Sequence, residues 1–547
     1  MARLSCCSFL PWLAIATSAL AAPPTARYVG SKACYGCHEQ IYRSFTKTNM
    51  GRSMRPAADL DRASFPTEAT VSVPGSNQTL RVFGDRTGWR QSESEPNVFV
   101  DEHQLDYAVG SGANGVTFLV RRGNYLFEAP LSYYSKANKW GLSPGYEYGD
   151  YGFSRSAPEG CILCHSGRAE PVLDHPGAYR DPPFQELAIG CENCHGPGET
   201  HANDPKGRGT IVNPAKLPPR LAENICMACH QRGDARVLQP GKTYQDFRPG
   251  QWLIDTVAIL KVPPDSEGRR EQDLLEHNAS MQASRCFLKS GGKLSCLTCH
   301  DPHVQPAVGE ASTYFRAKCF ICHTEQSCKV ALTVRQQTRS DSCIECHMPK
   351  RSIAVISHSA LTNHRIPARP NEPLPPWKPV SGSDLLIVNQ PEGSERPLSD
   401  ITRLRAYNDL AGQSPEYQRR YLSLLDQLSH SERNSPYVQA ALAHQALAEG
   451  KNEEALAHSA VGIQLGEAVV YEDMGRALAN LGRGDEAIAA FLKGMEMDPY
   501  RRELRKNLIL EYTNLKRYTE ARHAMEEYVG LFPEDSLMRT LLARVSK

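Results

Sequence analysis

The segment Cys191-Glu-Asn-Cys194-His195-Gly-Pro-Gly198-Glu-Thr-His201 carries the pattern that decides the fold of this chain. Two cysteines are separated by two residues, and a histidine directly follows the second one. The same C-x-x-C-H pattern occurs seven times in 547 residues, and we number the copies motif 1 to motif 7 in chain order. The cysteine pairs are, in that order, Cys34 and Cys37, Cys161 and Cys164, Cys191 and Cys194, Cys226 and Cys229, Cys296 and Cys299, Cys319 and Cys322, and Cys343 and Cys346. The histidines are His38, His165, His195, His230, His300, His323 and His347.

The covalent attachment of haem explains this spacing. Two thiols add to the two vinyl groups of one porphyrin, and the adjacent histidine then faces the iron as its proximal ligand. Structural zinc needs no histidine directly after each cysteine pair. A thioredoxin-like pair would occur once, and structural disulfides would not repeat one motif seven times. The sequence therefore predicts seven covalently attached haem c groups, held by these cysteines and proximal histidines.

The overall charge and the N-terminus limit the class of protein. Lys and Arg total 62 against 61 Asp and Glu, a balance that argues against a nucleic-acid partner. Residues 1–22 read as a secretory signal peptide, with a basic start, an apolar run and a cleavage site after Ala21 or Ala22; a membrane anchor is the alternative. No later window is long and apolar enough to predict a transmembrane span. We expect an exported protein, in the bacterial periplasm first, or else extracellular or associated with the outer membrane.

Histidines outside the motifs are the candidates for the second axial ligand of each iron. Seven of them lie between Cys34 and His364, one for each predicted haem, which favours two histidine ligands on every iron. Four follow a motif closely, whereas His103 lies in a strand-rich stretch. Met50 and Met54 compete for the first iron, and Met281 competes with His277. The candidate histidines are His103, His175, His201, His277, His303, His358 and His364.

Cys286 and Cys328 remain after the motifs and the signal peptide are counted. An even remainder in an exported chain predicts a disulfide between them. Free thiols or a thiolate ligand are the alternatives.

The chain divides into five segments. After the signal peptide, residues 23–155 hold the first haem site and a β-rich segment, with alternating runs such as Leu80–Phe83 and Tyr125–Glu128. This segment is rich in tyrosine, and we expect the rings to pack on haem faces or in a small sheet, with a substrate pocket as the alternative. Residues 156–366 hold six motifs and predict little regular secondary structure, so the porphyrins would form the core. Residues 367–400 form a Pro-rich linker, and residues 401–547 are helical.

The C-terminal helices follow a repeat of about 34 residues that is typical of tetratricopeptide repeats (TPR). Ala455, Ala487 and Ala521 occupy the small position at which two helices of a hairpin approach closely. Stacked hairpins of this kind form a superhelix that binds proteins or peptides. The fold class expected from the sequence is therefore mixed, with a multihaem cytochrome c domain, an inserted β-rich segment and an all-α TPR-like superhelix.

The chain resembles the exported multihaem c-type cytochromes that carry C-terminal tetratricopeptide repeats. Beyond the seven motifs, the resemblance lies in segments such as Val109–Gly112, Cys194–Gly198, Cys299–His303 and Cys346–Pro349, and in His358 with Thr362–His364. It implies that a histidine after C-H-G-P-G or C-H-D-P serves as a distal ligand, which favours His201 and His303. No C-x-x-C-K variant occurs, so the catalytic signature of pentahaem nitrite reductases is absent.

Three functions follow. The favoured one is a heptahaem carrier that passes electrons along closely packed low-spin haems, with a TPR domain for protein docking. The second is a terminal oxidoreductase with one open haem, the first being the best candidate, acting for example on a small nitrogen or sulfur oxyanion. The third is a haem-bearing interaction scaffold. The expected partners are periplasmic or quinol-linked electron donors and acceptors, and a protein or peptide on the repeats. Because each haem adds two propionates, the loaded protein would be acidic and favour basic redox partners.

Overall fold

The computed structural model describes residues 26–545 except 74, 150–151, 174, 208, 264–275, 308, 351–361, 370–371, 374–384 and 392–396. The predicted signal peptide, the candidate ligand His358 and much of the predicted Pro-rich linker lie outside the described residues.

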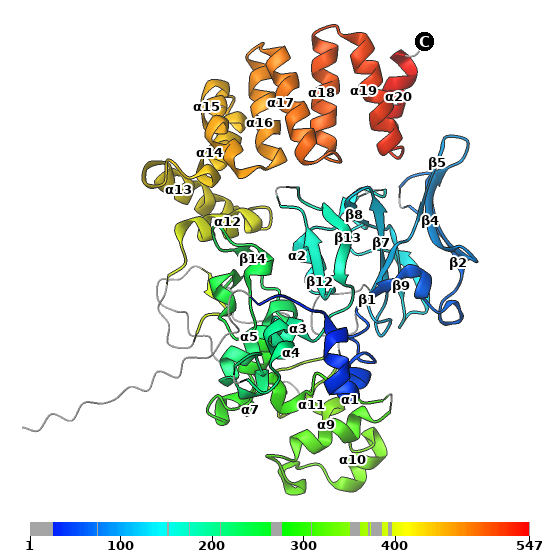
Figure 1. The fold of residues 1–547 in the computed structure, drawn as a ribbon, viewed down its shortest axis with the longest axis vertical. Helices are drawn as coiled ribbons and strands as arrows, with labels where there is room; N and C mark the ends of the chain where they lie inside the picture. The colour runs from blue at the N-terminus through cyan, green and yellow to red at the C-terminus, as the bar shows by residue number, and fades with distance from the viewer. Residues whose placement is uncertain are drawn as a thin grey trace, which may run out of the picture.

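Two antiparallel sheets form the N-terminal β-rich region, as the alternating runs predict. One sheet has the strand order β2-β3-β4-β5 and the other β1-β6-β7-β8-β11, with a β9–β10 hairpin beside them (Figure 1). The strands are β1 (Met54–Pro56), β2 (Glu68–Ser72), β3 (Thr79–Asp85), β4 (Gly88–Glu95), β5 (Phe99–Gln104), β6 (Tyr107–Val109), β7 (Thr117–Arg122), β8 (Tyr125–Glu128), β9 (Leu131–Tyr134), β10 (Lys139–Leu142) and β11 (Arg155–Ser156).

The core of this region follows from the alternation within the strands. In β3, Leu80 and Val82 are buried while Arg81 points outward and pairs with Glu68 on β2. Trp89 and Trp140 pack against each other inside, with ring centres 5.8 Å apart. The predicted tyrosine packing in a small sheet holds for Tyr133, which lies in this core.

Short helices and small sheets make up the middle of the chain. Each C-x-x-C-H motif lies on or beside a short helix. The helices are α1 (Tyr35–Phe45), α2 (Glu159–Ile162), α3 (Glu192–His195), α4 (Glu199–Asn203), α5 (Pro219–His230), α6 (His277–Gln282), α7 (Arg285–Lys289), α8 (Cys296–Cys299), α9 (Ala311–Cys319), α10 (Leu332–Arg339) and α11 (Cys343–His347). Single 3-10 turns are η1 (Ser31–Cys34), η2 (Ala57–Asp59), η3 (Arg62–Ser64), η4 (Pro214–Lys216), η5 (Tyr244–Asp246), η6 (Leu253–Asp255) and η8 (Glu325–Ser327).

The middle of the chain holds more regular structure than the sequence predicted. Strands β12 (Arg168–Pro171) and β13 (Tyr179–Glu186) pair with each other, and β14 (Ala235–Leu238), β15 (Val257–Lys261) and β16 (Leu386–Ile387) form a three-stranded sheet. The apolar run Val257–Leu260 is buried and therefore needs strand partners for its backbone groups. β14 supplies partners on one side, and β16 with Asn389 supplies them on the other, so this part of the predicted linker is a sheet edge rather than a free strap.

Stacked antiparallel hairpins form the C-terminal region, as the repeat predicts (Figure 1). The small residues Ala455, Ala487 and Ala521 are buried where paired helices cross. One further hairpin, α12 with α13, precedes the hairpin that carries Ala455. The helices are α12 (Asp400–Ala411), α13 (Pro415–Ser431), α14 (Pro436–Ala448), α15 (Asn452–Gly462), α16 (Ala468–Asn480), α17 (Gly484–Met497), α18 (Arg502–Asn514), α19 (Tyr518–Leu531) and α20 (Ser536–Val545), with a turn at η9 (Ile463–Leu465).

The helical region contacts the rest of the chain at both of its ends. At its start, Thr402 on α12 donates to Gln239 at 2.8 Å, and α12 packs on β14. At its end, Arg539 pairs with Glu95 at 2.6 Å, and the Tyr500 ring packs against Phe127 with centres 4.8 Å apart. No helix among the described residues has the length and apolarity needed to cross a bilayer.

A pair of glycines tests the packing of the repeats. A Cβ at Gly475 on α16 would lie 2.3 Å from the Phe491 ring, which is 1% exposed, whereas one at Gly530 on α19 would meet nothing within 4 Å. We expect Gly475→Ala to lower the free energy of unfolding by about 1–3 kcal/mol through overpacking. Gly530→Ala should leave it unchanged or raise it by about 0.5 kcal/mol. Denaturant titration of the full chain, followed by far-ultraviolet circular dichroism, measures both; equal effects would contradict the hairpin packing.

Candidate functional site

Thiols from motifs that are far apart in sequence lie in contact with each other. Four such pairs occur, namely Cys34 with Cys191, Cys164 with Cys229, Cys226 with Cys296, and Cys319 with Cys343. In two of them the partner thiol lowers the pKa of the other cysteine, Cys191 or Cys164, to about 7. These contacts join motif 1 to motif 3, motif 4 to motifs 2 and 5, and motif 6 to motif 7.

The motif cysteines are free thiols in the structure, and some of them face solvent. Cys37, Cys161, Cys322 and Cys346 are exposed, whereas the other motif cysteines are half-buried. Cys37 lies on α1 and is one of the two predicted attachment points of the first haem. Its side chain is exposed to solvent, whereas Cys34, the other cysteine of motif 1, is half-buried. The haem thioether at Cys37 stays a prediction, and the polypeptide around it leaves the thiol accessible.

A buried carboxylate joins motif 1 to motif 3. Glu192, the second residue of motif 3, is 5% exposed. Its carboxylate accepts hydrogen bonds from the backbone N–H of Val29 at 3.0 Å, of Gly30 at 2.7 Å and of Gly198 at 2.7 Å. The Ser31 hydroxyl accepts the N–H of Cys191 at 2.8 Å. These bonds hold the chain just before Cys34 against motif 3.

Hydrogen bonds also tie the neighbouring motifs together. The Ser53 hydroxyl donates to the His165 carbonyl of motif 2 at 2.7 Å and accepts the N–H of Ile189, just before motif 3, at 3.0 Å. Cys164 of motif 2 lies 3.8 Å from the Ala228 carbonyl within motif 4. Near motifs 6 and 7, α9 packs against α11, and the Ser312 hydroxyl on α9 donates to the hydroxyl of Ser342, just before α11, at 2.9 Å.

Three proximal histidines face a second histidine ring across a similar gap. His38 and His201 have ring centres 6.4 Å apart and planes at 20°, and His195 and His303 are 6.1 Å apart at 18°. The third pair, His300 and His364, is 6.3 Å apart at 28°. Each gap is too wide for direct ring stacking.

In four of these six rings, and in His347 of motif 7, a hydrogen bond occupies Nδ1. Nδ1 of His195 lies 2.7 Å from the Val212 carbonyl, and Nδ1 of His364 lies 3.0 Å from the Thr362 carbonyl. Nδ1 also meets an oxygen acceptor in His201, His303 and His347, at Thr210, Asp301 and Pro367 respectively. Because Nδ1 is occupied, Nε2 is the nitrogen free to bind a metal.

The ring of His277 completes a four-histidine cluster with His230, His300 and His364. Its centre lies 5.5 Å from that of His230 and 4.6 Å from that of His364. Burial, together with these neighbouring rings, lowers the pKa of His277 to about 3. The imidazole is therefore neutral at physiological pH, which is the form that binds metals.

Other candidate ligands lie away from these pairs. Nε2 of His103 contacts Asp101 at 2.9 Å, and its ring packs on Phe153. Nδ1 of His175 contacts the Met497 carbonyl at 3.1 Å, so it lies against the helical region. Met54 is buried in an apolar cluster with Ile162 of motif 2, not beside motif 1.

The two remaining candidate methionines and the two cysteines outside the motifs complete the set of candidate residues. Met50 is half-buried and lies just after α1, where its carbonyl accepts the N–H of Ser53. Met281 is buried on α6, next to the cluster of histidines that includes His277. Cys286 and Cys328 are separate thiols in the structure, so their predicted disulfide is not formed there. Cys286 lies near Cys299 of motif 5 instead.

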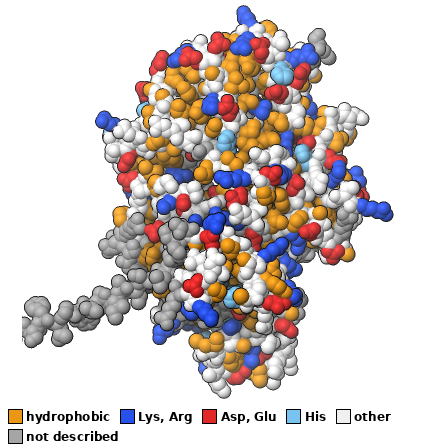
Figure 2. Space-filling view, viewed as in Figure 1, with side chains coloured by type: hydrophobic (Ala, Val, Ile, Leu, Met, Phe, Trp, Pro, Cys, Tyr) orange, Lys and Arg blue, Asp and Glu red, His pale blue; other side chains and the backbone are white. Residues whose placement is uncertain are grey.

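Motifs 5 to 7 lie in a segment that has almost no apolar core. Among the described residues from 282 to 384, Phe287 is the single buried apolar side chain. Large apolar side chains are exposed there instead, among them Ile321 at 65% and Val330 at 51%. Figure 2 shows apolar side chains at the surface at this end of the molecule. Burial of apolar surface drives folding, so this segment needs a further apolar component to be compact.

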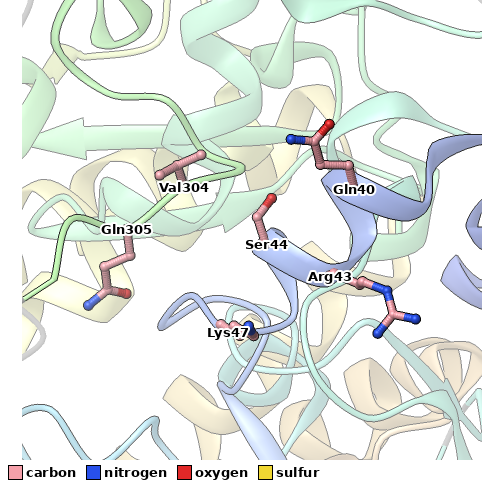
Figure 3. A pocket seen from close by; sticks show the side chains of 6 residues that line it. All are labelled: Gln40, Arg43, Ser44, Lys47, Val304 and Gln305. Atoms are coloured by element: carbon pink, nitrogen blue, oxygen red, sulfur yellow. The ribbon is translucent and has the colours of Figure 1, made fainter.

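A shallow pocket lies between the helix of motif 1 and the turn that follows motif 5. It has a volume of about 330 Å³ and is lined by Gln40, Arg43, Ser44 and Lys47 of the chain around α1, and by Val304 and Gln305. In Figure 3 the α1 side chains and the turn at 304–305 border the same space. Two cations, Arg43 and Lys47, therefore stand near the turn that carries His303, and they suit an anionic group such as a carboxylate.

The residues present fit a haem iron rather than a bare metal ion. Among the described residues, no group of three or more His, Cys, Asp or Glu side chains is arranged to hold a metal. The porphyrin supplies most of the ligands of a haem iron, so the protein would need to add only one or two side chains. With a metal–nitrogen distance of about 2.0 Å, two imidazoles on opposite sides of one metal have ring centres about 6.2 Å apart. The three wide pairs match this separation.

Sequence reasoning missed the residues that position the motifs. Glu192, Ser31 and Ser53 carry no metal-binding chemistry, so a search for ligands passes over them. One signal was available in the sequence. Glu192 lies between the two cysteines of motif 3 and shortly before a Gly-Pro-Gly turn, and its carboxylate accepts the N–H of the last glycine of that turn, Gly198.

No family model and no curated protein matches this chain. Among solved structures, the TPR domain of Arabidopsis OM64 shares 19% identity over 20% of this chain and 93% of its own, with a TM-score of 0.19. The second TPR domain of human RPAP3, solved with an HSP70 peptide, shares 21% identity over 21% of this chain and 99% of its own, with a TM-score of 0.19. MamA of Desulfovibrio magneticus shares 16% identity over 25% and 78%, with a TM-score of 0.23.

Two carboxylates that hold the same N-terminal segment give a matched test. Glu192→Ala leaves three backbone N–H groups without an acceptor and should weaken the segment by about 2–4 kcal/mol. Glu199→Ala removes an ion pair with Arg27, whose side chain is 82% exposed, and one exposed hydrogen bond from the Arg27 N–H, and should cost about 1 kcal/mol or less. Native-state trypsin cleavage after Lys32, followed by mass spectrometry, should be about tenfold faster or more in the first variant. Similar rates in both would refute the role given to Glu192.

Proposed function

We propose that this protein is a heptahaem c-type cytochrome that transfers electrons, with a helical repeat region for protein docking. The observation that carries the proposal is the set of three histidine pairs, each joining a C-x-x-C-H histidine to a distant histidine at the spacing of two ligands on one iron. When bound, haem supplies an iron that takes up and releases one electron.

The residues of the chain have distinct roles in this proposal. The cysteines of each motif fix one edge of a macrocycle, and the paired histidines set its orientation. Oxygen acceptors at Nδ1 hold the rings and raise their basicity as ligands. Two histidine ligands would leave no position for a substrate, which suits electron transfer rather than catalysis.

The small number of buried apolar side chains around motifs 5 to 7 supports the same proposal. Macrocycles bound to Cys299, Cys322 and Cys346 would cover side chains such as Ile321 and Val330. They would then act as the core that this segment otherwise lacks.

The pairing of His38 with His201 speaks against the alternative in which the first haem is open to a small oxyanion. In that alternative, motif 1 is the best candidate for a catalytic site. A histidine opposite His38 would occupy the position that a substrate needs.

We further propose that the helical region docks a protein partner. A solenoid fixed to the body at both ends, through α12 on one side and Arg539 and Tyr500 on the other, presents its middle hairpins on a rigid arc. The same proposal includes export to the periplasm, and an electron donor and an electron acceptor as redox partners of the haems.

The number of haems is the first test. We expect the mature protein, purified from a host that attaches haem c, to carry the mass of seven haems after denaturation. The pyridine haemochrome spectrum should give the same number per chain. Replacement of both cysteines of motif 7 (Cys343→Ser with Cys346→Ser) should reduce the number to six. A mass equal to that of the bare polypeptide would refute the proposal.

A histidine exchange tests the ligand pairs. His303→Met should give one of the seven irons a methionine ligand in place of histidine and raise its reduction potential. Potentiometric titration with near-infrared magnetic circular dichroism detects this change. The control is His103→Met, which should leave all ligand signals as they are, because His103 contacts Asp101 and Phe153. Identical spectra for the two variants would contradict the pairing of His195 with His303.

A further inference from the structure

The turn after motif 5 carries histidines that belong to two different ligand pairs. His300 is the proximal histidine of motif 5 and faces His364, whereas His303, three residues later, faces His195 of motif 3. Three residues of extended chain span at most about 11 Å between their Cα atoms. In the proposed function, the irons of motifs 3 and 5 are therefore neighbours, and an electron can pass directly between them.

Asp301 lies between these two histidines and orients the second one. Its carboxylate oxygen Oδ1 accepts the backbone N–H of His303 at 3.0 Å and lies 3.1 Å from Nδ1 of the same residue. A carboxylate that accepts the N–H two residues ahead forms an Asx-turn, and Pro302 in between restricts the backbone further. The bond to Nδ1 is thus set by the local chain, and it leaves Nε2 of His303 free to bind iron.

Two more hydrogen bonds fix the position of this turn. The N–H of Val304 donates to the Asp301 carbonyl at 3.2 Å. The side-chain oxygen of Gln305 accepts the N–H of Asn49, just after α1, at 2.8 Å. Because the polypeptide makes these contacts by itself, we expect Asp301 to stay at Nδ1 of His303 when Nε2 binds iron.

The charge of the acceptor at Nδ1 differs among the paired histidines. Among the described residues, Asp301 is the one carboxylate that meets Nδ1 in these pairs, and no Lys or Arg there forms an ion pair with it. An anionic acceptor draws the Nδ1 proton more strongly and makes the imidazole a better electron donor to iron, which stabilises ferric over ferrous iron. The other acceptors in the pairs are neutral oxygens, namely the carbonyls of Val212 and Thr362 and the hydroxyl of Thr210.

The pair of motif 5 has uncharged neighbours. The His300 ring packs on Phe315 with ring centres 5.4 Å apart, and the His364 ring packs on His277 with centres 4.6 Å apart. Nδ1 of His364 meets a backbone carbonyl. None of these groups carries a negative charge that would stabilise ferric iron as the carboxylate does beside motif 3.

We propose that Asp301 is a positioning residue that acts through His303, lowers the reduction potential of the motif 3 iron below that of the motif 5 iron, and so directs electrons from motif 3 to motif 5. This inference rests on the proposed function. One electron leaves the ferrous iron of motif 3 and arrives at the ferric iron of motif 5, and no proton or bond changes place. The Asp301 side chain is 46% exposed, so water screens part of its charge and limits the effect.

Asp301→Asn tests the charge, because asparagine keeps an oxygen for the Asx-turn and for Nδ1 but is neutral. In potentiometric titration of the holoprotein, one of the seven components should shift by about three- to tenfold toward the reduced form, and the others should stay in place. The haem number and the near-infrared magnetic circular dichroism of the histidine ligands should not change. The control is Asp101→Asn, which should leave all seven components unchanged because Asp101 contacts Nε2 of His103, outside the pairs.

Two ligand exchanges assign the components to irons. His303→Met should remove the component that Asp301→Asn shifts, and His364→Met should remove one of higher potential. If an exchange variant does not retain the haem concerned, the component missing from its titration gives the same assignment. Asp301→Asn added to His303→Met should shift the methionine-ligated iron less than it shifts the histidine-ligated one, since methionine has no Nδ1–H to donate.

Seven unchanged components in Asp301→Asn would overturn the inference, and so would a shifted component that lies above the one removed by His364→Met. An equal shift with histidine and with methionine at position 303 would show that the charge acts through space, and it would overturn the role of His303. Failure of the proposed function looks different, because the unmodified protein would then carry fewer than seven haems.

Discussion

The structure depends on histidines that reach from one motif to the histidine of another. The proximal rings of motifs 1, 3 and 5 face His201, His303 and His364, which follow motifs 3, 5 and 7. Each pair therefore joins a motif to a segment that lies two motifs further along the chain. Local attraction within the chain cannot form such contacts, and a shared metal would convert them into cross-links between distant segments.

The polypeptide around these pairs supplies position rather than a core. Glu192 and Ser53 place motifs by accepting or donating backbone hydrogen bonds, and both residues lie between segments that are far apart in the chain. The β-rich region and the helical region have their own apolar cores and meet at Tyr500 and Arg539. Between residues 282 and 384, by contrast, Phe287 is the single buried apolar side chain among those described.

The elements predicted from local patterns agree with the structure. Alternation predicted β3, β7 and β8, and the spacing of Ala455, Ala487 and Ala521 predicted the hairpins, because these signals reflect burial on one face of a strand or helix. The run around Val257–Leu260 was too short for a membrane span, and its actual role as a buried strand depends on β14 and β16, which lie elsewhere in the sequence. Non-local partners of this kind leave no local pattern.

For the candidate ligands, too, local sequence patterns predicted some features and non-local contacts decided the others. Proximity to a motif pointed to His201, His303 and His364, but no sequence pattern indicates which ring each one faces. The count of spare histidines included His175, yet this ring contacts Met497, since the helical region lies against β8 and the loop before β13. The partner of a histidine is decided by tertiary structure, and residue counts carry no information about it.

Each histidine pair joins segments that are two motifs apart, and this spacing limits how motifs can be added to or removed from the chain. In a solenoid such as the C-terminal region, one repeat can be added or removed because each repeat contacts only its neighbours. In the middle segment, removal of a single motif would shift every later histidine to the wrong partner. Two motifs are therefore the smallest unit that can be added or removed while the later histidines keep their partners.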